Sequence, residues 1–121
     1  MRIYLTKWFA RFARREGIGD ALLKDAVARA SRGLIDADLG GGLIKQRVAR
    51  SGRGRSAGYR IIIAYRSGQR SLFMFGFAKS ERDNLQSDEL EMLKEVAHRY
   101  LMASDASIEQ LVVNGDLSEL R

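Results

Sequence analysis

Apolar residues recur at helical spacing in the first third of the chain. One stripe, formed by Trp8 and two phenylalanines, is bounded by an N-cap threonine and a stop glycine. A second stripe follows Asp20, which we expect to cap it. The spacing predicts two helices, over residues 7–16 and about 20–32, with the aromatic stripe packed in the core.

The middle of the chain changes to strand-like runs. Three glycines in residues 36–42 mark a turn, after which β-branched and aromatic residues dominate. The runs cover Leu43–Arg50, Tyr59–Arg66 and Ser71–Ala78, and a short loop with the letters SGQ joins the last two as a hairpin. We expect an antiparallel sheet with apolar side chains on both faces. Phe73, Phe75 and Phe77 are expected to share one face.

Two further helices are predicted after the strands. Ser87 opens an apolar stripe with acidic residues in its first turn, and Ser107 begins a capping box with the letters SIEQ. The tail reads as a turn followed by a short extended piece. The sequence therefore predicts a single α+β domain over residues 1–121, in which N-terminal helices pack on a small antiparallel β-sheet and a C-terminal helix follows.

Composition removes several classes of protein. The chain has no cysteine and one histidine, so disulfides, thiolate nucleophiles and cysteine zinc sites are excluded. We expect no metal site and no small-molecule cofactor. No apolar run is long enough to span a membrane, and the N-terminus does not read as a signal peptide, so we expect a cytoplasmic protein without a membrane partner.

Positive charge is concentrated in one block. The formal net charge is +6, but residues 45–82 hold ten lysines or arginines against the single acid Glu81, a local balance of +9. The remainder of the chain is slightly acidic. A concentrated field attracts polyanions, most commonly nucleic acid. A solvated face that only aids solubility is the other interpretation.

Strand alternation brings several of these cations together. Lys45 and Arg47 are two residues apart, so they project from the same face of the first strand. In a hairpin of the next two strands, Arg60 at the entrance of one lies beside Lys79 at the exit of the other. Further cations extend the cluster from the end of the first strand, the glycine-rich loop and the loop after the third strand: Arg50, Arg53, Arg55 and Arg82.

Such a cluster suits a phosphodiester. Guanidinium groups present forked donors to phosphate oxygens, and a lysine with a shifted pKa can exchange a proton. In RNA the 2′-OH is itself the nucleophile, so a protein need only orient it and stabilise the developing charge. Neither a metal ion nor a histidine is required, and His98 is expected to be structural or surface-exposed. Simple phosphate binding uses the same residues, so the pattern alone leaves cleavage open.

The order of motifs resembles a known family. The segments IKQRVAR, GYRIIIAYR and SLFMFGFAKSERDNL, separated by a glycine-rich loop and a turn, are similar to the RelE/ParE toxin superfamily and, within it, to its HigB-like branch. The resemblance extends to about Ala103. It implies a metal-independent endoribonuclease that cuts messenger RNA on the ribosome, and a cognate HigA-like antitoxin with a helix-turn-helix domain.

The resemblance also assigns roles to residues. Catalytic roles fall on Lys45, Arg47, Arg60 and Lys79: the two arginines position the phosphate, and the two lysines stabilise charge or exchange a proton. RNA-backbone binding falls on Arg50, Arg53, Arg55 and Arg82. The arginine and tyrosine that follow the exit lysine in the best-known nucleases are replaced here by Ser80 and Gln86. Asp83 is a candidate general acid, although neighbouring cations favour an ionised, structural carboxylate.

Two other functions fit the same pattern. A ParE-like toxin would use this fold to poison DNA gyrase, with the arginines incidental. A toxin remnant without catalysis would bind RNA in a salt-sensitive way. The retention of four phosphate-directed cations favours the nuclease, because a gyrase poison has no need of them in one place.

Overall fold

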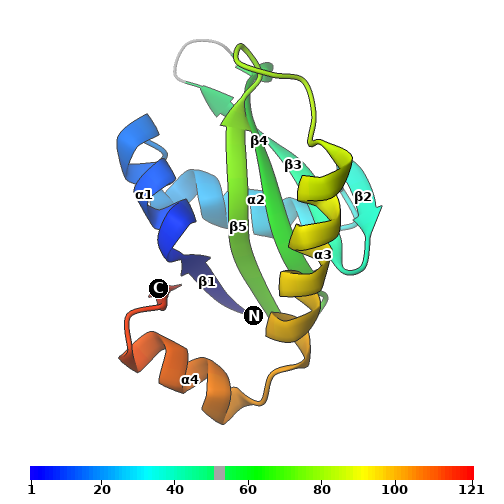
Figure 1. Ribbon diagram of the computed structural model, residues 1–121. Helices are drawn as coiled ribbons and strands as arrows, with labels where there is room; N and C mark the ends of the chain where they lie inside the picture. The colour runs from blue at the N-terminus through cyan, green and yellow to red at the C-terminus, as the bar shows by residue number, and fades with distance from the viewer. Residues whose placement is uncertain (51–53) are drawn as a thin grey trace.

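The computed structural model describes residues 1–50 and 54–121, with the main chain alone for residues 54–57. In this part of the chain, helices pack on both faces of a six-stranded sheet (Figure 1). The elements, in chain order, are β1 (Arg2–Thr6), α1 (Lys7–Glu16), α2 (Asp20–Ser31), β2 (Ala37–Gly40), β3 (Leu43–Arg50), β4 (Gly54–Arg66), β5 (Arg70–Ala78), α3 (Ser87–Met102), α4 (Asp105–Val113) and β6 (Leu117–Leu120). None of the helices in the described ranges is long and apolar enough to cross a membrane.

The sheet is mostly antiparallel. Its strand order is β2-β3-β4-β5-β1-β6, and β1 lies parallel to β5. The α+β class and the antiparallel core of β3, β4 and β5 are therefore as the sequence predicts. The sequence predicts a turn where β2 forms and no element where β1 forms, because each of these strands has five residues or fewer and shows no extended alternation.

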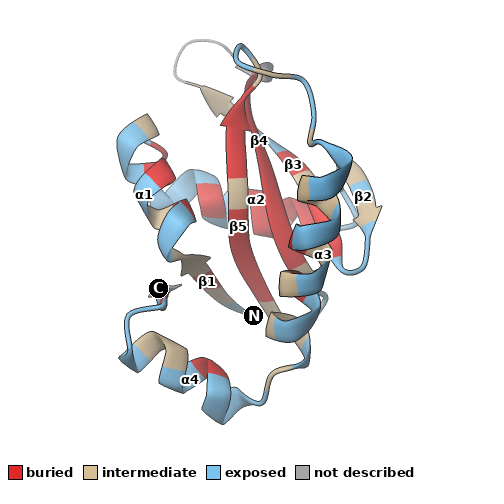
Figure 2. Cartoon of the chain, in the orientation of Figure 1, coloured by how far each residue is buried: buried red, intermediate tan, exposed pale blue. Residues whose placement is uncertain are grey.

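Two hydrophobic cores enclose the sheet. Phe9 and Phe12 of α1 and the apolar side of α2 pack on one face, which carries Ile61 and Ile63 of β4. Helices α3 and α4 cover the other face, around Ile62. Figure 2 shows β4 and β5 buried along most of their length between these layers. The prediction that both faces of the sheet are apolar is confirmed.

A bulge in β5 changes which phenylalanines share a face. Ile62 pairs with Phe75 whereas Ile63 pairs with Phe73, so β5 contains one extra residue at this point. The extra residue reverses the alternation: Phe73 lies in the core under α1 and α2, and Phe75 packs toward α3. The expectation that all three phenylalanines share a face is therefore wrong for Phe73.

Trp8 is not a core residue, contrary to the sequence prediction. Its side chain is 43% exposed and stacks on Phe12 and Phe75, with ring centroids 5.3 and 4.4 Å apart. The cause is the short length of β1, which pairs with β5 only as far as Phe73. In the described sheet no strand covers the edge of β5 beside Phe75, and the indole of Trp8 occupies this position.

Several element boundaries differ from the predicted ones. Gly19 rather than Asp20 is the N-cap of α2, and Ser104 rather than Ser107 caps α4, where the Ser104 hydroxyl accepts a hydrogen bond from the Ser107 main chain. Strand β4 begins at Gly54, within the segment that we expected to be loop. For these three elements the local sequence signals predicted the right type but left the first residue ambiguous by one to five positions.

Gly58 is required where β3 bulges against β4. The register of the two strands shifts between Val48 and Arg50, and a Cβ at residue 58 would lie 2.1 Å from the main-chain oxygen of Val48. We predict that Gly58→Ala lowers the free energy of unfolding by about 2 to 3 kcal/mol, as overpacking against main chain does, measured by chemical denaturation.

Gly19→Ala is the matched control, since no atom lies within 4 Å of the added Cβ. We expect it to cost less than about 1 kcal/mol, the difference between glycine and alanine at an N-cap. Equal stability of Gly58→Ala and the wild type would contradict the described packing of the bulge.

Candidate functional site

Two arginines lie directly opposite each other on adjacent strands. Arg47 of β3 is paired with Arg60 of β4, and Arg60 is paired with Phe77 of β5. The main-chain N–H and C=O of Arg47 are bound by Asp36 and Arg29, on the side away from β4. Arg47 and Arg60 therefore form a non-hydrogen-bonded pair, the arrangement that brings opposite side chains closest.

The position of Arg60 in the sheet affects its charge. The residue is only 6% exposed. Burial, and after it the charge of Arg47, lowers the pKa of the Arg60 guanidinium from its usual value, while Asp36 and Asp83 act in the opposite direction. An arginine remains charged despite such a shift. Two positive charges are thus held side by side at the cost of mutual repulsion.

Lysines flank the arginine pair on either side. Lys45 lies opposite Ile62, one row of the sheet from Arg47 on the same face, and is partly exposed. Lys79 follows β5, and its main-chain N–H donates to Gly58 two residues before Arg60. We refer to the set below as the basic site: Lys45, Arg47, Arg60, Lys79 and Arg82.

Asp83 neutralises part of the basic site. Its carboxylate accepts a hydrogen bond from Lys79, which lowers the pKa of the Asp83 carboxyl below its usual value, and Arg60 lowers it further. The carboxyl is therefore ionised at neutral pH. A group in this state accepts protons and hydrogen bonds rather than donating them, which agrees with the expectation that Asp83 is structural.

Arg82 closes the site over two aromatic rings. Its guanidinium lies 5.3 Å from the ring centroid of Phe75 and 4.9 Å from that of Phe77, and it binds both carboxylate oxygens of Glu89 at 2.8 and 3.1 Å. Glu89 also accepts from the Gln86 main chain as part of the capping box of α3. The loop after β5 is thus fixed to the start of α3 (Figure 1).

The remaining predicted residues do not all join the basic site. Arg50 lies over the ring of Tyr59, 5.7 Å from its centroid, and Tyr59 belongs to the core under α1 and α2. The structure therefore places Arg50 apart from the arginine pair. Arg55 lies in β4 with only its main chain described, and Arg53 lies outside the described residues. His98 is exposed on α3, as expected.

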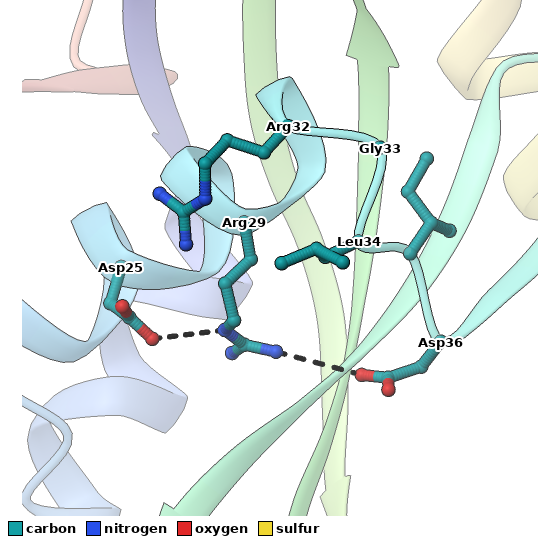
Figure 3. A pocket seen from close by; sticks show the side chains of 7 residues that line it. Asp25, Arg29, Arg32, Gly33, Leu34 and Asp36 are labelled. Atoms are coloured by element: carbon teal, nitrogen blue, oxygen red, sulfur yellow. Dashed lines mark hydrogen bonds and ion pairs between the residues drawn. The ribbon is translucent and has the colours of Figure 1, made fainter.

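Sequence reasoning missed two residues behind the site. Arg29 of α2 is almost fully buried, and Asp36 follows it in the loop before β2; both line a surface pocket (Figure 3). Asp36 stood in a segment identified only as a turn. Arg29 lies three residues from the buried Ala26, close to the apolar stripe that predicts α2, and forms an i,i+4 ion pair with Asp25.

The donor set of the basic site suits an anion rather than a metal ion. All five side chains are cationic, and within the described ranges no group of three or more histidines, cysteines, aspartates or glutamates could hold a metal. Guanidinium donors match phosphate oxygens in geometry and charge. The site can hold a phosphate and stabilise added negative charge on it.

A known protein family matches almost the whole chain. The family model described as the RelE toxin of the RelE / RelB toxin-antitoxin system matches residues 1–120. No curated protein matches the chain at a significant level. The match includes β3, β4, β5 and the loop after β5, and so covers every residue of the basic site.

The ion pair between Arg82 and Glu89 makes stability depend on pH. The hydrogen bond from Arg82 is the main cause that lowers the pKa of the Glu89 carboxyl in the folded state. A lowered carboxyl pKa contributes stability above the unfolded-state pKa, and this contribution disappears as the pH falls through the folded-state value. We predict that Arg82→Gln reduces the free energy of unfolding by up to about 1 kcal/mol near neutral pH.

The difference between the two proteins should shrink as the pH falls below the ordinary range of a glutamate carboxyl, because Glu89 then takes up a proton and the ion pair is lost. Chemical denaturation of both proteins at a series of pH values measures it. A difference that stays constant across the series would show that the ion pair does not contribute.

Proposed function

The chain belongs to the RelE toxin family, and we propose that it acts as an endoribonuclease that cuts messenger RNA on the ribosome. As a member of this family it is the toxin of a type II toxin–antitoxin system and has a cognate antitoxin. The cleavage, the ribosome as the place of action and the cytoplasm as the compartment are parts of the proposal. Membership of the HigB-like branch is also part of the proposal, and it is favoured by Ser80, which directly follows Lys79.

The observation that carries the proposal is the pairing of Arg47 with Arg60. The two positive charges repel each other in the free protein, and an RNA phosphate between them would relieve this repulsion. Lys45 and Lys79 lie on either side, where the charge of a pentacoordinate phosphorus would develop. Few other ligands require four cations at one end of a sheet.

The proposed reaction is an internal transfer. The ribose 2′-oxygen attacks the adjacent phosphorus, the bond from phosphorus to the 5′-oxygen breaks, and a 2′,3′-cyclic phosphate and a 5′-hydroxyl result. Arg47 and Arg60 hold the non-bridging oxygens in line for attack. Lys45 and Lys79 stabilise the added charge, and proton exchange at the 2′- and 5′-oxygens is assigned to them rather than to a metal ion or to Asp83.

The antitoxin is proposed to be HigA-like. The basic site gives the toxin a surface that an acidic segment would neutralise, which fits a partner that silences the toxin by charge complementarity. A helix-turn-helix domain in that partner would allow the complex to bind its own operator.

The basic site is tested by removing two of its cations. We predict that Arg60→Ala/Lys79→Ala abolishes growth arrest on induction in bacteria and removes the in-frame cuts within translated messages that the wild type produces. Mapping of transcript 5′ ends in both strains measures this. The expected loss is at least about 100-fold, because two groups that contact the reacting phosphate are lost together.

Arg11→Ala/Arg14→Ala is the control with the same change of charge. Both arginines are exposed on α1 and line a pocket with Gly115 and Ser118, and neither belongs to the basic site. This variant should arrest growth and cut transcripts as the wild type does. Growth arrest without transcript cleavage in the wild type would instead favour a gyrase poison, and a harmless wild type would favour a remnant that only binds RNA.

Asp83 offers a separate test of its assignment. Since its carboxyl is ionised and bound to Lys79, Asp83→Asn should leave cleavage within about threefold of the wild type, because no proton donor is removed. The rate of cleavage of ribosome-bound messenger RNA measures the effect. A loss as large as that of Lys79→Ala would identify Asp83 as a member of the catalytic group.

A further inference from the structure

Strand β2 does not extend along β3 as far as Arg47. Its pairing with β3 covers Leu43 to Lys45, so the main-chain N–H and C=O of Arg47 point to an edge of β3 that no strand covers in the described sheet. An open strand edge exposes unpaired polar groups. Here the Arg47 N–H donates to the carboxylate of Asp36, and the Arg47 carbonyl oxygen accepts from Nη2 of Arg29 at 2.7 Å.

Arg29 is held on both sides. Its side chain is 8% exposed, its Nε donates to Oδ2 of Asp25 at 2.9 Å, and its Nη1 lies 3.7 Å from Oδ2 of Asp36 (Figure 3). The planar guanidinium therefore links one turn of α2, the loop before β2 and the main chain of Arg47. A lysine could not make these three contacts at once.

A buried glutamine holds the loop that carries Asp36. Gln46, fully buried, accepts the main-chain N–H of Asp36 at 2.9 Å and donates to the carbonyl oxygens of Ala26 and Leu34 at 2.9 and 3.1 Å. Gln46 thus bonds the loop that carries Asp36 to β3 and to α2. A satisfied buried polar network of this kind specifies one local structure.

We propose that Arg29 and Asp36 are positioning residues that hold the main chain of Arg47, and through it the direction in which the Arg47 guanidinium meets the RNA phosphate. This inference rests on the proposed function of the basic site. The two residues bind the main chain of Arg47 in the plane of the sheet. The side chain of Arg47 projects from the face that also carries Arg60. Arg29 and Asp36 hold β3 in place against the repulsion between the two arginines.

A double-mutant cycle separates positioning from general stability. We expect Arg29→Lys to lower the single-turnover rate of cleavage of ribosome-bound messenger RNA by about 10- to 100-fold, because a shift of about 1 Å at a phosphate-binding group has effects of this size. In an Arg47→Ala background the same substitution should change the rate by no more than about twofold, since the residue it positions is gone. Thermal unfolding is measured on every variant.

Arg32→Lys is the matched control. Arg32 lines the same pocket as the C-cap residue directly after α2, and no hydrogen bond or ion pair of its side chain is found within the described ranges. This variant should cleave as the wild type does. If Arg29→Lys does not fold, Asp36→Ala replaces it, because Asp36 is 29% exposed and tolerates truncation better, and the same coupling to Arg47 is expected.

The outcomes are distinguishable. An unchanged rate for Arg29→Lys, or an equal loss in the wild-type and Arg47→Ala backgrounds, would overturn the positioning role and leave the proposed nuclease site intact. If Arg47→Ala itself cleaves as fast as the wild type, the basic site is not the site of cleavage, and both proposals fall.

Discussion

The register between β3 and β4 is the constraint on which the rest of this structure depends. It places Arg47 opposite Arg60 in a pair that brings like charges together, where most sheets place opposite charges or apolar side chains. A shift of one residue would send Arg47 to the face covered by α1 and α2, into the core. Two features fix this register. One is the β-bulge after Val48, where Gly58 leaves room for the main chain. The other is the pair of hydrogen bonds that join the Arg47 main chain to Asp36 and Arg29.

Ion pairs around the two arginines neutralise part of the positive charge of the basic site and fix the loop after β5. Among the described residues, Lys79 is bound to the carboxylate of Asp83 and Arg82 to that of Glu89, and Glu89 also belongs to the capping box of α3. Within the arginine pair, Arg60 is buried beside Phe77, whereas Arg47 is exposed. Holding two like charges together lowers the stability of the fold. Such a loss of stability is expected at a site whose residues serve function.

Much of this account could be predicted from the sequence, and the reasons for the rest are physical. The apolar periodicities of α1 and β4 are strong local signals, and the alternation of Lys45 and Arg47 placed them correctly on one face. The bulge that reverses the alternation of β5 after Phe73 has no signature in the local residue pattern. Arg29 acts on a residue 18 positions away through a main-chain oxygen, and such a contact has no signature in residue type.

The central claim is that the protein holds two repelling arginines together for the sake of a phosphate. The most direct measurement is the free energy of unfolding of Arg47→Gln, taken together with its rate of RNA cleavage. The account predicts that this variant is more stable than the wild type, by up to about 1 kcal/mol, since the like-charge pair is removed. It also predicts that the rate of cleavage falls by about 100- to 1,000-fold. A variant that is less stable and still cleaves RNA at the wild-type rate would contradict it.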